Sequence, residues 1–306
     1  MSYGFLATNN SGQVLVSSDT RNLHFKGKYV SPSLVKQTDS YGGLRHLRYS
    51  FECVVTPVPF FTMPTASAYY AIARIANTVN TTWEVDVITN STSSNYPELY
   101  VFVDPRGTSS TETHGMLVYH SDGTPSFDSR KSPLAVVGGG SITHPTNPRN
   151  ASIGGLSARN CSSSFGSNFA PDNESGDLIV GTLPAKPIFH YSSLAQAERQ
   201  QEFYDSEEEC SSWDCGTCVF YSTTKQWWST YWTFYRGGLR ISGANSVKAG
   251  WITVEWGCNW RYNEDSDFLG IGVGGSSGIG GYWPYSNETI NLSSAAVIIA
   301  DGARYD

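Results

Sequence analysis

Short apolar runs and alternating apolar and polar positions, bounded by glycine, proline and asparagine, fill most of this chain. Such runs predict β-strands, and the 3.6-residue period of an amphipathic helix is nearly absent. The predicted strands cover residues 3–8, 13–17, 48–55, 69–75, 83–89, 98–103, 218–235, 250–257 and 294–300. Because turn residues separate them, rather than helices, we expect a mostly β protein built of antiparallel, β-sandwich-like modules with long loops.

Three segments depart from this pattern. Pro57, Pro59 and Pro64 interrupt one apolar stretch, and because proline has no N–H to donate, we expect an edge strand or a crossing segment there. Residues 193–207 have capping-box spacing and a thin apolar stripe, which predicts one short helix. Residues 138–176 have almost no periodicity and predict a long irregular arm or loop that lies over a neighbour or partner.

The chain also repeats itself. Residues 3–23 (YGFLATNNSGQVLVSSDTRNL) and 114–134 (HGMLVYHSDGTPSFDSRKSPL) correspond at a constant offset of 111 (114 − 3). The identical pairs are Gly4/Gly115, Leu6/Leu117, Gly12/Gly123, Ser18/Ser129 and Leu23/Leu134. In both copies a strand, a polar turn that ends in glycine and a second strand predict a β-hairpin. We therefore expect one hairpin unit to be used twice.

The repeat suggests how the chain is divided. Its second copy closes an N-terminal β module, residues 1–137, which carries the repeated hairpin. The irregular arm or loop, 138–176, follows, and an aromatic-rich C-terminal β module covers 177–306. Whether residues 138–306 form one domain or two stays open.

Composition narrows the classes of partner. Only 15% of the residues are charged, 13% are aromatic, and the net charge is −7. A protein that binds a phosphate backbone needs a basic stripe, which is missing here, so we expect no nucleic-acid partner. No apolar run reaches the about 18 residues of a membrane helix, and the first residues lack a secretory-signal pattern. We therefore expect no membrane insertion and folding in a cytosol.

Four of the six cysteines, Cys210, Cys215, Cys218 and Cys258, could act together. The spacing of the first three is that of the start of a plant-type iron–sulfur site, and thiolates also bind zinc. Bulky and acidic neighbours count against a metal. Three alternatives stay open: a structural metal, a disulfide formed in an oxidising medium with Cys258 as one partner, or free thiols.

Two further motifs match a binding pattern only in part. Residues 270–275 satisfy G-x-G-x-x-G, but the glycine-rich residues after them cannot begin the helix that a dinucleotide site requires, so we expect a loop. Asn263, Asp265 and Asp267 alternate like calcium ligands, but the glycine and the glutamate of an EF-hand loop are missing. A looser calcium site stays open beside a solvated polar turn.

No catalytic arrangement is evident. Residues 207–209 with Asp205, or with a distant carboxylate such as Glu255, could supply a glycosidase pair, which must face one cleft about 5–10 Å apart. Adjacent residues at a helix end point in different directions, so we expect a solvated acidic face instead. The histidines are scattered outside any nucleophile or metal motif: His24, His46, His114, His120, His144 and His190. We assign no catalytic, cofactor-binding or metal-binding residue and expect no enzyme.

The densest aromatic band lies in residues 220–235. Strand alternation places on one face Trp228, Trp232 and Phe234, and on the other Trp227, Tyr231 and Tyr235. Two interpretations stay open. One face lies in a core and the other in an interface or a sugar-stacking platform, or both faces lie in a sandwich core.

The residues of the repeat resemble a family. Tyr3-Gly4-Phe5-Leu6 opens the chain, and the later unit at 114–119 leads to Gly123 and to residues 127–130 (FDSR). These residues, with PVPF at 57–60 and LYVFV at 99–103, resemble short virion proteins of tailed bacteriophages. The resemblance covers roughly residues 1–137 and leaves 138–306 without a match.

The resemblance implies a non-enzymatic structural component of a phage tail, associated with the baseplate, tail tip or fibre. It implies assembly in the host cytoplasm, a final place in the virion tail, and other tail proteins and copies of the same chain as partners, hence a homo-oligomer. The first alternative is a receptor-binding adhesin that recognises host surface glycan through the aromatic C-terminal face. The second is a glycan hydrolase.

Overall fold

The computed structural model describes residues 6–8, 14–17, 22–38, 44–107, 113–145, 177–191, 196–210, 213–214, 217–218, 221–268, 285–291 and 295–306. Regular structure in these ranges is almost entirely antiparallel β-strand. The helical turns among them are the short 3-10 helices η1 (Pro105–Gly107) and η3 (Gly302–Tyr305). The predicted mostly β, antiparallel fold class is confirmed.

Two sheets form the body. The smaller has six strands in the order β12 (Val136–Ile142), β21 (Ala295–Asp301), β14 (Pro187–Tyr191), β6 (Val58–Phe61), β9 (Leu99–Val103) and β3 (His24–Tyr29). The larger has nine strands, and its main path is β13 (Asp177–Ile179), β19 (Ser246–Phe268), β18 (Tyr221–Gly243), β7 (Tyr70–Val79), β8 (Thr82–Thr89), β5 (Leu44–Glu52) and β4 (Ser33–Thr38). Beside this path, β15 (Gln196–Cys210) pairs with β18, and β20 (Tyr285–Asn291) pairs with β15. Both sheets take strands from the predicted 1–137 and 177–306 modules, so those modules share their sheets.

The two sheets pack face to face as a sandwich around one main core. Its fully buried residues come from both sheets and include Leu47, Val85, Val87, Leu99, Val101, Phe189 and Leu239. A second core lies on the other face of the smaller sheet and contains Phe60, Tyr100, Phe102, Ile188, Ala300 and Tyr305. Strand β9 is therefore buried at all five positions, which explains its unbroken apolar sequence.

The predicted helix at 193–207 is wrong, because β15 occupies Gln196–Cys210. This strand pairs with β18 without interruption, from Gln196↔Arg236 to Cys210↔Ser222. The weak local helix signal is overridden by a continuous ladder of backbone hydrogen bonds to a neighbour that is distant in sequence.

The expectation of an edge or crossing segment around Pro59 is also wrong. Strand β6 lies inside the smaller sheet, between β14 and β9. It pairs with β14 at a single position, Phe189↔Phe61. The missing N–H of Pro59 therefore removes few backbone hydrogen bonds between β6 and β14. There the His190 ring donates from Nδ1 to the Pro59 carbonyl oxygen at 2.8 Å, and this side-chain bond replaces a backbone one.

The irregular segment predicted at 138–176 begins too early, because residues 138–142 belong to β12. A Cβ atom on Gly138 would lie 2.7 Å from the Val180 carbonyl oxygen, and one on Gly139 would lie 2.5 Å from that of Val297. These glycines, which suggested a loop, are needed where neighbouring backbones approach closely within a sheet. Residues 146–176 lie outside the described residues.

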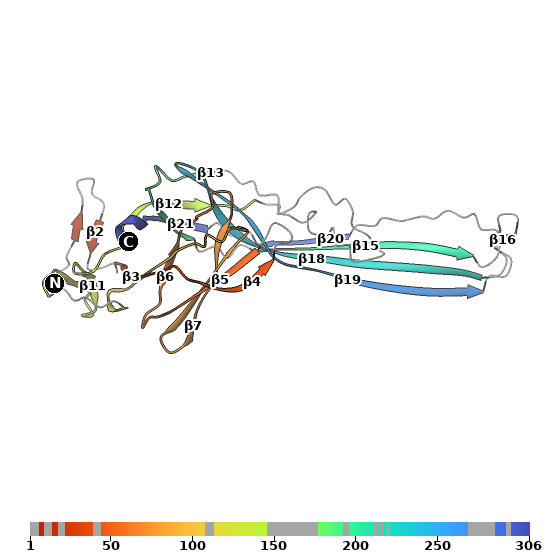
Figure 1. Cartoon of the computed structure of the whole chain (residues 1–306), viewed down its shortest axis with the longest axis horizontal. Coiled ribbons are helices and arrows are strands. Elements are labelled where there is room, and N and C mark those ends of the chain that lie inside the picture. The colour runs from red at the N-terminus through yellow and green to blue at the C-terminus, as the bar shows by residue number, and fades with distance from the viewer. Residues whose placement is uncertain are drawn as a thin grey trace.

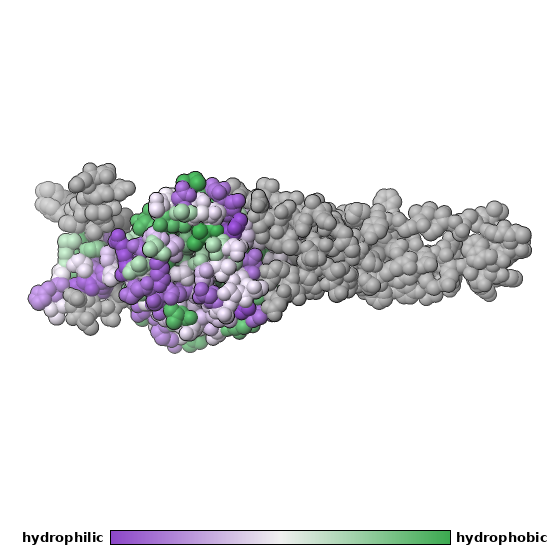
Figure 2. Space-filling view, turned by 45° about the horizontal axis from the view of Figure 1, so that its top comes forward, coloured by the Kyte–Doolittle hydropathy of each residue, from purple (hydrophilic) through white to green (hydrophobic). Residues whose placement is uncertain are grey.

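Figure 1 shows that the molecule is elongated. The short strands β2 (Val14–Ser17) and β11 (Pro125–Asp128) lie at one end, the sandwich follows, and the long strands β15, β18 and β19 run side by side beyond it. We call the described residues 196–210, 221–236, 253–268 and 285–291 the arm. On the face of the sandwich in Figure 2, hydrophobic side chains form small patches among hydrophilic ones, as on ordinary soluble proteins.

Candidate functional site

The repeated unit is a pair of hairpins with one register. The first consists of β1 (Leu6–Thr8) and β2 (Val14–Ser17), and the second of β10 (Leu117–Tyr119) and β11 (Pro125–Asp128). The pairs in the first are Leu6↔Ser17, Ala7↔Val16 and Thr8↔Val14; those in the second are Leu117↔Asp128, Val118↔Phe127 and Tyr119↔Pro125. Each pair maps onto its counterpart at the offset of 111, and the same register shift follows the second pair of both. The predicted double use of one hairpin is confirmed.

The two copies meet where their equivalent residues touch. Strands β2 and β11 have Cα atoms within 8 Å of each other. The Leu134 N–H donates to the Leu23 carbonyl oxygen at 2.7 Å, and Leu23 and Leu134 correspond at the same offset. Both side chains pack against the second core. The two hairpins are therefore attached to the outer face of the smaller sheet through the equivalent residues Leu23 and Leu134.

A buried histidine fastens the second hairpin to β3. His24 is fully buried, its Nδ1 donates to the Asn22 carbonyl oxygen at 2.9 Å, and its Nε2 accepts from the Asp128 N–H at 3.3 Å. One nitrogen must carry a proton and the other must not, so the geometry requires the neutral ring. Burial lowers the pKa of His24, which favours that neutral form.

Asp128, which ends the second hairpin, is held by charge. Its carboxylate accepts two hydrogen bonds from Arg130, Nε to Oδ1 at 2.7 Å and Nη2 to Oδ2 at 2.8 Å, and the side chain is 2% exposed. The Arg130 guanidinium lowers the pKa of Asp128 to about 2. On the outside of this hairpin, Met116, Leu117 and Tyr119 are exposed.

The described strands of the arm form one sheet, and their register defines its two faces. Residues paired directly across an antiparallel ladder share a face, and neighbours along a strand alternate. One face, which we call the aromatic face, contains positions Phe203, Trp227, Ser229, Tyr231, Thr233, Trp256, Cys258, Trp260 and Tyr262. It also contains positions Arg199, Gln201 and Asp205 on β15 and, towards the far end, the charged row Glu207–Lys225–Glu264. The opposite face, the polar face, contains positions Gln200, Glu202, Tyr204, Trp228, Thr230, Trp232, Asn259 and Arg261.

The sandwich end of the arm shows the same asymmetry in side-chain burial. Tyr235, which continues the aromatic face, is buried with Ala197 and Trp251. Phe234, which continues the polar face, is 39% exposed. The interpretation that both faces of the aromatic band lie in a sandwich core is therefore wrong at Phe234, and the band continues into the arm. Phe220 lies outside the described residues.

The register separates Cys258 from two of its predicted partners. Cys210 pairs with Ser222 and Cys258 with Tyr231, nine positions apart along β18 (231 − 222), or about 30 Å. Cys218, in β17 (Thr217–Cys218), precedes the far end of β18 by three residues and lies at least about 20 Å from Cys258. A disulfide requires Cα atoms within about 7 Å, so Cys258 joins neither residue in a disulfide or a shared metal site. Cys215 lies outside the described residues.

The acidic motifs lie in regular strands. Glu207 pairs with Lys225, whereas Glu255 pairs with Phe234, nine positions and about 30 Å away along β18. That separation excludes this glycosidase pair, which needs about 5–10 Å. Asn263, Asp265 and Asp267 belong to β19, so the expected polar turn is wrong. No three His, Cys, Asp or Glu side chains within the described ranges are placed to hold a metal, and residues 270–275 lie outside those ranges.

The remaining histidines occupy separate places. His190 and His144 lie in the body, where the Nε2 of buried His144 is hydrogen-bonded to Tyr191 Oη. His114 precedes β10, His120 begins the turn between β10 and β11, and His46 lies on β5. The structure does not bring these histidines together.

Two polar clusters were missed in the sequence. On the outer face of the larger sheet, Asp86 is 2% exposed and accepts from Arg48 Nε and Nη2 at 2.8 and 3.0 Å. Burial alone would raise the pKa of Asp86, but the interactions with Arg48 and His46 together outweigh it and hold the pKa below its usual range. Cross-strand pairing of alternating charges on β5 and β8 is the signal that could have found it.

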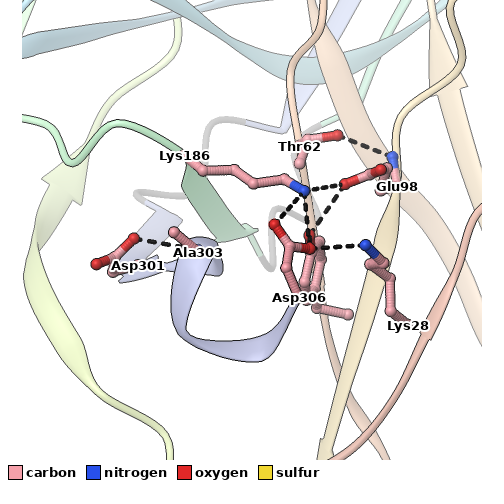
Figure 3. Close-up of polar contacts among 8 residues, drawn as sticks. Lys28, Thr62, Glu98, Lys186, Asp301, Ala303 and Asp306 are labelled. Carbon is pink, nitrogen blue, oxygen red and sulfur yellow. Dashed lines mark hydrogen bonds and ion pairs between the residues drawn. The ribbon is translucent and has the colours of Figure 1, made fainter.

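The second cluster surrounds Asp306 (Figure 3). Lys28 Nζ lies 2.6 Å and Lys186 Nζ 2.7 Å from its carboxylate, and the Tyr100 hydroxyl donates to Oδ1 at 2.9 Å. Lys186 also pairs with Glu98 at 2.8 Å. Lys28, Tyr100 and Lys186 lie 278, 206 and 120 positions from Asp306 in the sequence. No local motif could therefore reveal the cluster. It holds the last 3-10 turn over the second core.

Comparison with known proteins gives no assignment: no family model matches this chain, and neither a curated protein nor a solved structure is significantly similar to it. In the part of the chain that the structure describes, no helix is long and apolar enough to span a membrane. The candidate functional surfaces are therefore defined by geometry alone, as the hairpin pair at one end and the arm at the other.

Proposed function

We propose that this protein is a non-enzymatic structural component of a bacteriophage tail, associated with the baseplate, tail tip or fibre, and that it acts through protein–protein contacts. The observation that carries the proposal is the placement of two extended structures, the hairpin pair and the arm, at opposite ends of one sandwich (Figure 1). An elongated body with separate surfaces at its two ends is suited to joining successive components of an assembly.

Physical chemistry supports an assembly role for both ends. Isolated hairpins and single-layered ribbons are marginally stable unless a face is buried. The second hairpin exposes Met116, Leu117 and Tyr119, and the arm carries many aromatic positions on one face. Tyrosine, tryptophan and methionine are enriched in protein interfaces relative to the rest of the surface. The partners are then other tail proteins and copies of this chain, which assemble in the host cytoplasm and remain in the virion tail.

The test is the location of the chain in intact particles. Particles of a phage that encodes this sequence are purified by density gradient and analysed by quantitative mass spectrometry, and an antibody to the chain is located by gold labelling in the electron microscope. We expect a fixed number of copies per particle and label on the tail. Recovery of the chain only from soluble lysate, with none in particles, would contradict the proposal.

The arm also supports one alternative. Aromatic rings on an exposed sheet face can stack on sugars, and Phe234 at the sandwich end of the arm is 39% exposed. A receptor-binding adhesin for host surface glycan would bind purified host polysaccharide as the isolated chain and lose that binding in Phe234→Ala. Release of reducing sugar in the same assay would indicate a glycan hydrolase instead.

A further inference from the structure

We propose that protonation of His24 releases the second hairpin, β10 and β11, from β3 while the sandwich stays folded. The second hairpin is then a pH-sensitive element of the fold. The inference goes beyond the proposed tail role and does not depend on it. It follows from the hydrogen bonds of the His24 ring, from the charges beside the ring and from the place of the hairpin outside both cores.

The second hairpin is attached to β3 through β11. Just before β3 begins, the Asn22 N–H donates to the Ser126 carbonyl oxygen at 3.0 Å. The centroid of the Phe127 ring lies 5.7 Å from that of the His24 ring, and Ser126 and Asp128 are both buried. Because the His24 ring also bonds to the Asn22 carbonyl and to the Asp128 N–H, these contacts meet at the ring.

The two hydrogen bonds of the His24 ring exist only while the ring is neutral. The Asn22 carbonyl oxygen can only accept and the Asp128 N–H can only donate, so Nδ1 carries the proton and Nε2 has none. Protonation places a second N–H at Nε2, opposite the Asp128 N–H, and two donors repel each other. The ring is fully buried, so water reaches the new N–H only after the hairpin has moved away.

The surroundings of the ring favour the neutral form. Burial is the main cause that lowers the pKa of His24, and the Lys131 ammonium group lowers it further. The backbone hydrogen bonds to Asn22 and Asp128 and the Asp128 carboxylate raise the pKa but do not outweigh burial. Protonation of the attached ring is therefore unfavourable, and release of the hairpin removes that cost.

The charged groups on the elements beside the ring are paired with one another. Asp128 pairs with Arg130 at 2.7 Å and with Lys131 at 3.5 Å. At η1, which lies against β11, Asp104 pairs with Arg106 at 2.9 Å, and β9, the neighbour of β3, has no charged residue. Among these described residues three cations already face two carboxylates, so a positive charge at His24 has no carboxylate of its own.

The release stays local because the second hairpin lies outside both cores of the sandwich. Neither the main core nor the second core contains a residue of β10 or β11. After the hairpin, Leu134 packs against the second core and its N–H donates to the Leu23 carbonyl oxygen. Segments with few core contacts open while the rest of a protein stays folded. Release of residues 117–128 therefore leaves the sandwich and the contact between Leu23 and Leu134 in place.

The pH of release follows from the two surroundings of the ring. In the released state the His24 ring meets water and has an ordinary pKa near 6.5, whereas burial lowers its pKa in the attached state. Below about pH 6.5 the released state therefore binds the proton first. Its population rises by up to about tenfold per pH unit until the attached ring is protonated as well. Asp128, with a pKa of about 2, keeps its charge in this range.

Hydrogen exchange of the full chain, measured by mass spectrometry from about pH 7.5 to about pH 5 and corrected for the intrinsic exchange rate, tests the proposal. We expect the protection of peptides that cover residues 117–128 to fall by up to about tenfold per pH unit below about 6.5. Peptides that cover residues 99–103 in the sandwich should keep their protection. In His24→Gln, which keeps a donor and an acceptor but binds no proton, the protection of the hairpin should stay constant.

The matched control is His190→Gln. Burial also lowers the pKa of His190, but this residue lies on β14 inside the sandwich, so the hairpin should lose protection as in the unmodified chain. If His24→Gln melts below the assay temperature, Lys131→Gln replaces it. Without the ammonium group the attached His24 ring binds a proton more readily, so the total loss of protection should become smaller.

A hairpin that keeps its protection down to about pH 5 would overturn the proposal. A parallel loss of protection in residues 99–103 would do the same, because the opening would then be global. A loss that is equal in His24→Gln and in the unmodified chain, or that disappears in His190→Gln, would assign the titration to another group. None of these outcomes depends on where the chain is found, so they are distinct from failure of the phage role.

Discussion

Strands β18 and β19 pass through two different surroundings, and their residues change at the boundary. Within the sandwich, most of their fully buried side chains are small or aliphatic, namely Leu239, Val247, Ala249 and Ile252, and Trp251 of β19 is the fully buried aromatic one. Along the arm, the same strands carry Trp227, Tyr231, Trp256 and Trp260 on one face. The antiparallel pairing of β18 with β19 extends through both regions, with register shifts after Phe234, near the boundary, and after Ile241.

The difference shows how a strand sequence indicates the kind of partner it needs. Aliphatic side chains fill the interior of one chain at crystal-like density. Tyrosine and tryptophan combine a large apolar area with a polar group, which suits surfaces that are buried only on association. Within the described residues, the change from aliphatic to aromatic residues along β18 therefore coincides with the end of the main core, whose last members on β18 are Leu239 and Ile241.

The largest expected effect is in the sandwich part of β18. Leu239 is fully buried in the main core, so Leu239→Ala should lower the free energy of unfolding by about 3 kcal/mol, through lost burial and the cavity left behind. Urea denaturation measures this loss. Val79→Ala, at a valine that is 65% exposed on β7, should cost less than about 0.5 kcal/mol. Equal losses in the free energy of unfolding would contradict the buried packing of Leu239 and the exposure of Val79.

A smaller effect is expected at the boundary between sandwich and arm. A Cβ atom on Gly237 would lie 2.2 Å from Nε2 of His144, whose buried ring contacts Trp251 with centroids 5.1 Å apart. Gly237→Ala should therefore cost about 2 kcal/mol of overpacking, seen as a lower melting temperature. The matched change Gly243→Ala meets only the Ser246 hydroxyl oxygen at 3.1 Å, which can rotate away. A melting temperature unchanged by Gly237→Ala would show that the boundary is loosely packed.

Most of the sandwich was predictable from the sequence because strand signals are local. Alternation over residues 83–89 and the apolar run 98–103 predicted β8 (Thr82–Thr89) and β9 (Leu99–Val103) almost to the residue. The repeated hairpins were found for the same reason, since each turn lies within its own copy. The fold class therefore followed from patterns of a few residues.

The errors arose where a distant neighbour decides the structure. β15 is a strand because β18 pairs with it at every position, and β12 is a strand because its glycines fit against the Val180 and Val297 carbonyls. The functional surfaces were missed in part for the same reason. The aromatic face becomes visible only when the register of β18 and β19 combines Tyr231 with Trp256 and Trp260.

Acid should lower the free energy of unfolding through the second hairpin (β10 and β11). This hairpin lies outside the sandwich, like the arm, but polar contacts hold it in place. The Arg130 guanidinium lowers the pKa of Asp128 to about 2, against an ordinary value near 4. A carboxyl group whose pKa is lower in the folded protein stabilises the fold at pH values above its pKa in the unfolded chain. This stabilisation is lost as the pH falls from about 4 towards 2. The contribution is on the order of 2 kcal/mol at neutral pH. Asp128→Asn should remove this part of the pH dependence in urea titrations, whereas an unchanged slope would contradict it.

Milder acid should act on the same end through His24. Burial lowers the pKa of His24 in the folded protein, so below about 6.5 the unfolded chain binds the proton first, and stability falls until the folded pKa is reached. His24→Gln keeps one donor and one acceptor but cannot titrate, and should flatten this decline. Burial also lowers the pKa of His190, so His190 adds to the decline in the same direction. A decline of stability that is unchanged in His24→Gln would contradict the assignment.

The smallest effect is expected at Asp306, where charges meet at the surface of the sandwich. Its side chain is 37% exposed, and its partners Lys28 and Lys186 are 29% and 30% exposed, so solvent screens the attraction. Ion pairs of this exposure contribute about 0–1 kcal/mol. Asp306→Asn keeps an acceptor for the Tyr100 hydroxyl and should therefore lower the free energy of unfolding by less than about 1 kcal/mol. The loss should shrink in high salt, because only the Coulombic part is removed. A larger loss that persists in salt would mean that Asp306 acts through packing of the final turn on Tyr100, as the buried residues of the sandwich do, and not as a surface charge.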